Sequence, residues 1–206
     1  KLLTQMFVSG MGTSVIAGNF IAFSIAALIN LPGNALGSAS TIITGRRLGN
    51  GQIAQAEIQL RHIFWLSTIG LTAIAWLTAP FAGVMASFYT HDQDVKEVIV
   101  ILIWLNAAFM PIWAASWVLP SGFKGARDVR FAMWVSMLGM WGCRVVAGYT
   151  LGIVLGWGVV GVWLGMFFDW AVRAALFYWR MVTGRWLWKY PRPEREKCIK
   201  QPVASE

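Results

Sequence analysis

The fold is decided by an uncharged stretch over residues 98–123, which reads VIVILIWLNAAFMPIWAASWVLPSGF. Two further stretches without Asp, Glu, Lys or Arg cover residues 2–45 and 63–90, and Arg144 is the one charged residue within 131–168. A helix of about 20 apolar residues is long enough to cross the hydrocarbon core of a bilayer. The positions of the charges therefore predict an all-α integral membrane protein.

The composition excludes the usual soluble classes. The chain is 57% apolar and 13% charged, whereas a soluble domain has about 45–50% apolar and about 25% charged residues. The two cysteines cannot pair, because Cys143 is expected within a helix and Cys198 in the tail. His62 and His91 are expected on opposite sides of the membrane, so no catalytic constellation forms. We expect neither an enzyme nor a metal site.

Six membrane-spanning helices are expected. The second has Pro32 near its middle, and a proline there kinks a helix because it removes a backbone hydrogen bond. The fourth is expected to be interrupted by Pro111 and Pro120. The six spans cover about residues 1–12, 14–48, 62–79, 95–121, 130–155 and 158–182, within a transmembrane unit over residues 1–188.

The segments between the spans are more polar. Residues 53–61 are interpreted as an interfacial connector and residues 80–94 as a loop, with an interfacial segment over 81–89 left open. From residue 189 onward, proline and charge predict a disordered tail over 189–206. Residues 2–12 reach about 16 Å as a helix, half of a crossing, so the chain is expected to begin inside a helix.

The net charge of +8 is distributed in separate clusters. Residues 46–61, 124–130 and 180–200 carry net charges of +2, +2 and +5, and residues 92–97 carry −2. Basic loops of membrane proteins face the cytoplasm, which predicts a cytoplasmic C-terminus. The basic residues are not gathered on one soluble surface, so the expected partner is the lipid bilayer and no nucleic acid.

Four ionisable side chains are expected inside the bilayer: Lys1, Arg144, Asp169 and Arg173. Asp169 and Arg173 are four residues apart on one helix and can pair directly. Arg144 and Asp169 each lie eleven residues from the turn near residues 155–158, so both are expected about 16 Å from the same membrane surface. The pattern predicts a cluster in which Asp169 binds both arginines.

The role of this cluster has two interpretations. It is a structural triad, or it is part of a proton or ion relay. The structural role is favoured, because two cations around one acid leave little for a substrate. Lys1 has no partner visible in the sequence. Glycines at positions 148, 152 and 156 and at 161 and 165 predict that the last two helices pack closely.

Polar residues in the kinked helix and soft or aromatic residues around Pro111 are candidates for a cavity lining. The asparagines could instead bond a neighbouring helix, and packing in the core is the alternative for the others. The candidates are Asn19, Asn30, Pro32, Asn34, Asn106, Met110 and Trp113.

Several motifs resemble the multidrug and toxic compound extrusion (MATE) family, over nearly the whole chain. The most specific is Gly161-Val162-Trp163-x-x-Met166-x-x-Asp169-Trp170-x-x-Arg173. The others are Gly12-Thr13-x-x-Ile16-Ala17-x-Asn19, Leu31-Pro32-Gly33, Trp141-x-x-Arg144, and the run from Gly122 to Phe131, GFKGARDVRF.

The resemblance implies a transporter of the bacterial inner (plasma) membrane. Such proteins have twelve helices in two pseudo-symmetric lobes, and this chain corresponds to the seventh helix, truncated, through the twelfth. The partner is then an N-terminal six-helix lobe. The resemblance implies export of small organic cations and drugs against sodium or protons, by alternating access of the two lobes.

The chain departs from the family in its coupling residues. Some members place carboxylates on the tenth helix, but residues 98–121 contain no Asp or Glu, and Asn106 is the nearest polar substitute. The resemblance therefore implies that the coupling ion, sodium or proton, binds in the N-terminal half, and no other cofactor is expected. Two alternatives stay open, a flippase for lipid-linked saccharides and a non-transporting, half-size subunit that dimerises.

Overall fold

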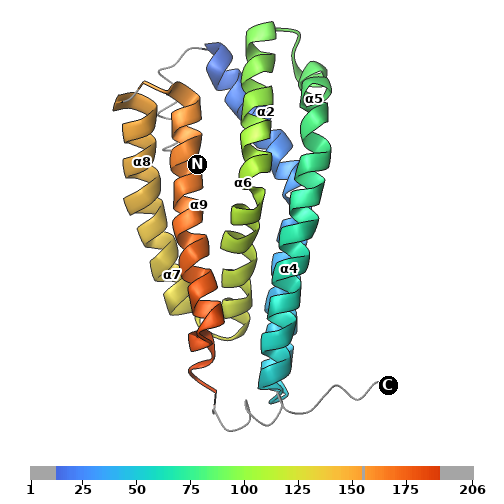
Figure 1. The fold of residues 1–206 in the computed structure, drawn as a ribbon, viewed down its shortest axis with the longest axis vertical. Helices are drawn as coiled ribbons and strands as arrows, with labels where there is room; N and C mark the ends of the chain where they lie inside the picture. The colour runs from blue at the N-terminus through green and yellow to red at the C-terminus, as the bar shows by residue number, and fades with distance from the viewer. Residues whose placement is uncertain (1–12, 155, 191–206) are drawn as a thin grey trace.

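The computed structural model describes residues 13–154 and 156–190, and every regular element in these ranges is a helix. The helices lie side by side in one elongated bundle (Figure 1). Lys1, the rest of the first expected span and the tail from residue 191 lie outside the described residues. By length and hydropathy, four helices of the described part could cross a membrane, or five when the bent pair at its start counts as one span.

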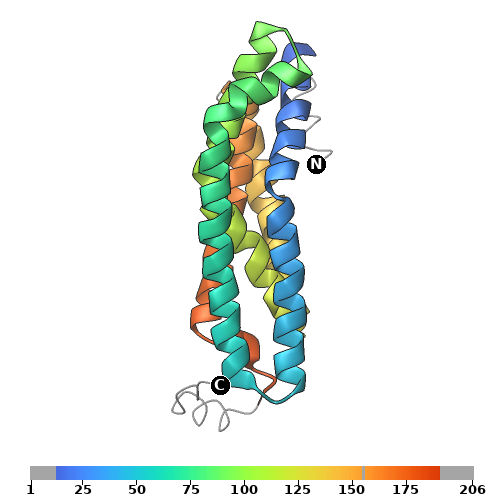
Figure 2. The same cartoon turned by 90° about the vertical axis from the view of Figure 1, so that its right-hand side faces the viewer.

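A break at Asn30 divides the second expected span into two helices. α2 (Thr13–Ile29) and α3 (Leu31–Gly49) are bent by 46° relative to each other (Figure 2). Pro32 stands in the first turn of α3, where its missing N–H costs the new helix no hydrogen bond. The predicted kink is therefore present, but it lies two residues before the proline and separates two helices instead of bending one.

α4 (Ile53–Thr78) begins nine residues earlier than expected. The interfacial connector predicted over residues 53–61 is wrong, because these residues form the first turns of the helix. Two glutamine side chains of this segment and that of the residue just before it accept hydrogen bonds from Arg47 at 2.7–3.2 Å, which places the polar side of the helix against the end of α3. The three glutamines are Gln52, Gln55 and Gln59.

The segment after α4 is also helical. η1 (Ala79–Phe81) and α5 (Ala82–Tyr89) continue directly from α4, so the loop predicted over residues 80–94 is wrong for most of its length, and a helix stands where a separate segment over 81–89 was left open. Pro80 fits there because it stands in the first turn of η1. Ala79, Ala82 and Ala86 are fully buried against α6, which explains why this segment packs as a helix.

α6 (Gln93–Gly125) runs through the centre of the bundle. Asp92 caps it, since its carboxylate accepts a hydrogen bond from the Asp94 backbone N–H at 3.1 Å. The interruptions predicted at Pro111 and Pro120 are wrong, because the helix continues through both. Contacts with α2, α3, α4 and α9 surround α6, and such packing allows a membrane helix to tolerate missing backbone hydrogen bonds.

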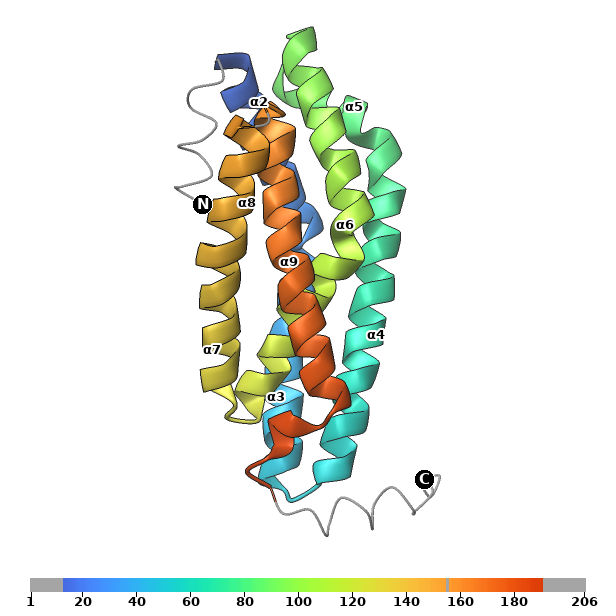
Figure 3. The same ribbon diagram turned by 60° about the vertical axis from the view of Figure 1, so that its left-hand side comes forward.

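The fifth expected span is one rod with two widened turns. α7 (Val129–Leu138) and α8 (Val146–Tyr149) are joined by a π-helical segment, Gly139–Val145, and a second one, Thr150–Val154, follows. The rod lies beside α9 (Gly158–Val182), which covers the range predicted for the sixth span (Figure 3). A short helix, η4, follows α9 at residues 185–187.

Glycines bring α8 and α9 into backbone contact. A Cβ atom at Gly165 would lie 2.5 Å from the backbone nitrogen of Gly148, and one at Gly161 would lie 2.4 Å from the Leu151 carbonyl oxygen. Real Cβ atoms do not approach other atoms so closely, so only glycine fits at these two positions. The close packing predicted from the glycine spacing is confirmed.

The charged segments lie at the two ends of the bundle. The α3–α4 turn, the α6–α7 turn and the end of α9 share one end, and the α5–α6 turn lies at the other (Figure 1). The first three hold the basic segments, as far as residue 190, and the fourth holds the acidic residues 92–97. Between the ends, apolar side chains such as Leu77 and Phe88 are 75% and 85% exposed, as expected for helices that face lipid.

Candidate functional site

A buried ion cluster lies in the middle of α9. The Oδ2 atom of Asp169 is 2.5 Å from Nη2 of Arg173 and 3.3 Å from Nε of Arg144. The Asp169 side chain has no exposed surface, whereas the two arginine side chains are about one fifth exposed, at 21% and 19%. The predicted pairing of Asp169 with both arginines is confirmed.

Three features of the fold position this cluster. Asp169 and Arg173 are one turn apart on α9, and Arg144 belongs to the π-helical segment that faces them. Gly139 opens the same segment, and a Cβ atom there would lie 2.3 Å from Oδ1 of Asp169. The carboxylate therefore occupies space that only a glycine leaves on the neighbouring rod. Widened π-helical turns occur often at functional sites.

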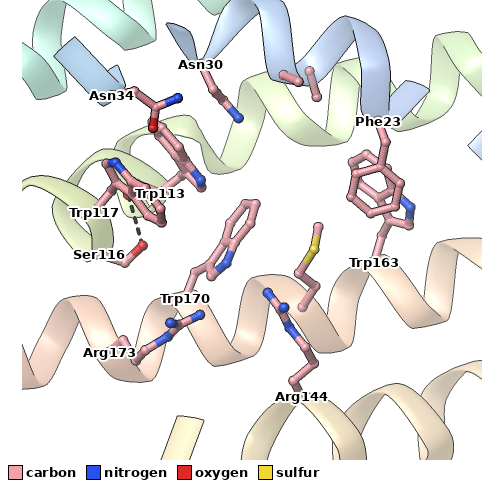
Figure 4. Close-up of a pocket in the computed structure, with 13 residues that line it drawn as sticks. Phe23, Asn30, Asn34, Trp113, Ser116, Trp117, Arg144, Trp163, Trp170 and Arg173 are labelled. Atoms are coloured by element: carbon pink, nitrogen blue, oxygen red, sulfur yellow. Dashed lines mark hydrogen bonds between the residues drawn. The ribbon is translucent and has the colours of Figure 1, made fainter. Parts of the chain in front are cut away.

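A cavity of about 350 Å³ opens beside the cluster. It lies between the α2–α3 break, α6 and α9, and the side chains of both arginines point toward it (Figure 4). Its walls are largely aromatic, with amide and guanidinium groups between the rings. The lining residues are Phe23, Ala26, Ala27, Asn30, Asn34, Trp113, Ser116, Trp117, Arg144, Trp163, Met166, Trp170 and Arg173.

Five of the predicted site residues meet at this cavity. They are Asn30, Asn34, Trp113, Arg144 and Arg173. The two asparagines reach it because the chain breaks between α2 and α3, so that residues from both helices face the same space. The Oδ1 atom of Asn30 is buried and has no hydrogen-bond partner among the described residues.

Four predicted cavity residues do not line it. Asn19 is 1% exposed and accepts a hydrogen bond from Nε1 of Trp163 at 2.9 Å, so it joins α2 to α9. Asn106 and Met110 are 2% and 0% exposed in the packed middle of α6. Pro32 is exposed in the first turn of α3 and does not line the cavity. These four side chains lie on faces of their helices that do not line the cavity.

Sequence reasoning missed the contribution of α9 to the cavity. Trp163, Met166 and Trp170 line it together with Arg173, and their spacing of three, four and three residues places them on one face of the helix. The same spacing brings Ser116 and Trp117 beside Trp113 on α6. A search for large side chains on the same face of the helix as Arg173 would have found the three α9 residues.

A second cavity of about 290 Å³ adjoins the first. The two share Ser116, Trp117 and Arg173 as lining residues. The second also reaches Lys124 in the last turn of α6 and Val129 in the first turn of α7. The shared residues connect the space at mid-height with the end of the bundle where the basic segments lie.

A second ion pair lies at that end of the bundle and joins α9 to the α6–α7 turn. Nε of Arg180 is 2.6 Å from Oδ2 of Asp128, and its guanidinium lies 3.9 Å from the ring centre of Phe131. Nζ of Lys189 donates a hydrogen bond to the Arg127 carbonyl oxygen at 3.1 Å. From the sequence these residues were expected only as loop charges, and no motif in the sequence joins them.

Long apolar helices around a polar cavity, with ionised groups buried at mid-height, define a multi-pass membrane protein of the transporter type. The MatE family model matches residues 1–150, and the chain belongs to this family, as its motifs suggest. The fold agrees: a crystal structure of a MATE mutant superimposes with a TM-score of 0.81 at 23% identity, covering 89% of this chain and 41% of that one.

Curated relatives have names that refer to transport or multidrug resistance. The uncharacterized transporter YisQ of Bacillus subtilis is 25% identical over 190 residues, covering 92% of this chain and 42% of that protein. The multidrug resistance protein MdtK of Yersinia pseudotuberculosis is 28% identical over 194 residues, with coverages of 92% and 42%. The probable multidrug resistance protein NorM of Mannheimia succiniciproducens is 25% identical over 183 residues, with coverages of 87% and 39%. The chain thus spans about two fifths of the length of these relatives.

Proposed function

We propose that this chain is the C-terminal six-helix lobe of a secondary multidrug exporter. The observation that carries the proposal is the cavity of about 350 Å³ beside the ion cluster, with aromatic, amide and guanidinium groups in its wall. Ligand sites for drug-sized molecules have volumes of about 300–1,000 Å³. Relatives named for multidrug resistance support the same function here. The protein carries out no covalent chemistry in this proposal.

The proposed partner is an N-terminal six-helix lobe. The chain covers about two fifths of its relatives, which leaves the length of a second lobe. Two such lobes would open the space between them alternately to the two sides of the membrane. The three basic segments at one end of the bundle support an orientation with the C-terminus in the cytoplasm, in the bacterial inner membrane.

Export is proposed to be driven by sodium ions or protons bound in the N-terminal lobe. In the described part of this chain, no Asp or Glu lines the cavity. Asp169 is fully buried and is in contact with two guanidinium groups. A sodium ion or a proton at Asp169 would have to compete with both of these contacts. Asp169 is therefore assigned a structural role.

Transport is tested with the full-length protein in vesicles. A fluorescent organic cation, a neutral dye and a fluorescent aromatic anion are each loaded, and a sodium gradient or a pH gradient is imposed separately. We expect dye movement against its own gradient under one of the two ion gradients, and none when an ionophore dissipates that gradient. Vesicles that move none of the three dyes under either gradient would contradict the proposal.

A second candidate, a flippase for lipid-linked saccharides, is favoured by the two arginines in the cavity wall, because such ligands carry phosphates. The same vesicles distinguish it. A flippase would translocate a fluorescent lipid pyrophosphate without moving water-soluble dyes, whereas the exporter would do the reverse.

A further inference from the structure

The charged groups that face the cavity all have one sign. Arg144 and Arg173 line it, whereas Asp169 lies behind them and has no exposed surface. With two guanidinium groups and one carboxylate, the cluster carries a net charge of +1. Among the residues that the structure describes, no Asp or Glu belongs to the wall of this cavity or of its neighbour.

The positive charge continues into the neighbouring cavity. Arg173 belongs to both walls, and Lys124 is the other charged residue of the second one. The hydroxyl-bearing residues Ser121 and Ser136 stand beside Lys124 in that wall. A ligand that moved from the first cavity toward the end of the bundle would pass cationic and hydroxyl groups.

Part of the cavity wall is aromatic. The rings of Trp113 and Trp117 are stacked, with centroids 5.8 Å apart and 9° between their planes. Trp170 meets Trp113 edge to face, with centroids 6.5 Å apart. Such faces stack on planar aromatic rings of either charge. They also attract cations, by about 0.5–2 kcal/mol, so the rings alone do not select the charge of a ligand.

The two guanidinium groups determine which ligand charge the cavity favours. A guanidinium presents a planar set of N–H donors that matches a carboxylate, and hydrogen bonds between charged partners are about twice as strong as neutral ones. The contact of Asp169 with Arg144 is at Nε and that with Arg173 is at Nη2, and both arginine side chains also belong to the cavity wall. A cationic ligand in the same space would approach a cluster of its own sign.

We propose that this cavity binds a small aromatic anion, with its ring among the tryptophans and its carboxylate at Arg144 and Arg173. The inference refines the proposed function by naming the class of substrate, and only its relevance to export rests on that function. It also reverses the charge that the family resemblance implies for the substrate.

Binding is measured by titration calorimetry on the purified full-length protein, without any ion gradient. Three ligands share one ring system and differ in charge: 2-naphthoate, 2-naphthamide and 2-naphthylmethylammonium. We expect 2-naphthoate to bind at least about tenfold more tightly than 2-naphthamide, and the ammonium compound to bind most weakly. Equal or tighter binding of the ammonium compound would overturn the inference.

Variants locate the binding to the cavity. Arg144→Gln leaves Asp169 paired with Arg173 and reduces the charge of the cluster from +1 to zero. It should weaken 2-naphthoate about tenfold or more and leave 2-naphthamide within about twofold. Arg144→Lys keeps the charge and should bind 2-naphthoate more tightly than Arg144→Gln. The matched control is Arg185→Gln, which removes an exposed arginine at the far end of α9 and should change nothing.

Unchanged 2-naphthoate affinity in Arg144→Gln contradicts the assignment. If that variant does not fold, the three-ligand comparison on the unaltered protein still decides the question. The outcome is separate from the transport test: a protein that binds 2-naphthoate selectively but moves no dye refutes the exporter and leaves the site. A protein that exports cationic dyes and ignores the charge of the naphthyl ligands refutes the site and leaves the exporter.

Discussion

Asp169 is the residue that balances the positive charges in the interior of the bundle. Its carboxylate has no exposed surface and contacts two guanidinium groups, which otherwise would lie unpaired within the bundle. Burial of an isolated charge is costly, and removal of one partner from a buried ion pair costs about 3–5 kcal/mol. The acid is therefore more important for folding than either arginine alone, since each arginine can be lost while the other still pairs.

Asp169→Asn should lower the yield of folded protein more than it changes ion selectivity. The amide keeps the shape of the side chain but leaves Arg144 and Arg173 without an anion, at about 3 kcal/mol. Size-exclusion profiles and thermal unfolding in detergent measure the effect. Asp94→Asn, at an exposed position near the start of α6, is the control and should stay within about 0.5 kcal/mol. Normal folding with a changed coupling ion would instead indicate a relay.

Gly139→Ala should destabilise the protein by about 1–3 kcal/mol, because the new methyl group would lie 2.3 Å from Oδ1 of Asp169. Gly142→Ala is the matched control from the same π-helical segment, where a Cβ atom meets nothing within 4 Å. Thermal unfolding of the two variants should differ by several degrees. Equal unfolding temperatures would show that the rod moves away from α9 at little cost.

Much of the ion cluster could be predicted from the sequence. Counting α-helical rise from one short turn predicts that Arg144 and Asp169 meet, and they do, although Arg144 lies in a π-helical segment. The cavity could not be predicted in the same way. Asn30 and Asn34 reach it but Asn19 does not, and this difference depends on the direction of α3 after the break, which is set by packing against α6.

At the scale of the elements, the contact between α8 and α9 shows that glycine spacing does not reveal which of the glycines could be replaced by a larger residue. Gly148 and Gly165 lie on the two sides of one contact, yet the available space is not shared equally. A Cβ atom at Gly165 would lie 2.5 Å from the backbone of α8, whereas one at Gly148 would meet nothing within 4 Å. The motif predicts the contact, and the structure alone shows which partner must be glycine.

Gly165→Ala should therefore destabilise the protein strongly, by about 1–3 kcal/mol or more, because backbone atoms cannot move as a flexible side chain can. Gly148→Ala should be tolerated, since alanine is also favoured over glycine within helices. Thermal unfolding of both variants in the same detergent measures the difference. Equal losses at the two positions would contradict this orientation of the contact.

Helix boundaries were the least predictable part of the fold. Residues 53–61 have the composition of a surface connector, but Gln55 and Gln59 bind Arg47, as does Gln52 just before them, and the segment becomes the start of α4. Pro111 and Pro120 would end an isolated helix, but α6 continues because other helices surround it. In each case a contact distant along the chain overrides a correct local expectation.

At the scale of the whole molecule, charge separates the two ends of the bundle. The basic turns gather at one end, where Asp128 also binds Arg180 and so ties the α6–α7 turn to the last turn of α9. The acidic turn before α6 lies at the other end. This asymmetry favours one orientation in a bilayer.

Cysteine labelling tests the orientation. Gln93→Cys and Arg130→Cys place single thiols at exposed positions at opposite ends of the bundle, in a background with Cys143→Ser and Cys198→Ser. A membrane-impermeant maleimide added to intact cells should label Gln93→Cys at once. Arg130→Cys should react only after the cells are permeabilised. The opposite pattern would place the basic end outside the cell.

The unbalanced charge of the Asp169 cluster lies halfway along α9, and so halfway through the voltage that a living cell maintains across its membrane. A full elementary charge carried across 100 mV gains or loses about 2.3 kcal/mol, so a charge at this depth experiences about half of that. Any step that displaces α9 along the membrane normal would therefore move charge within the membrane and produce a measurable current. Occupation of the cavity by an anion would cancel that charge and make the same step electrically silent.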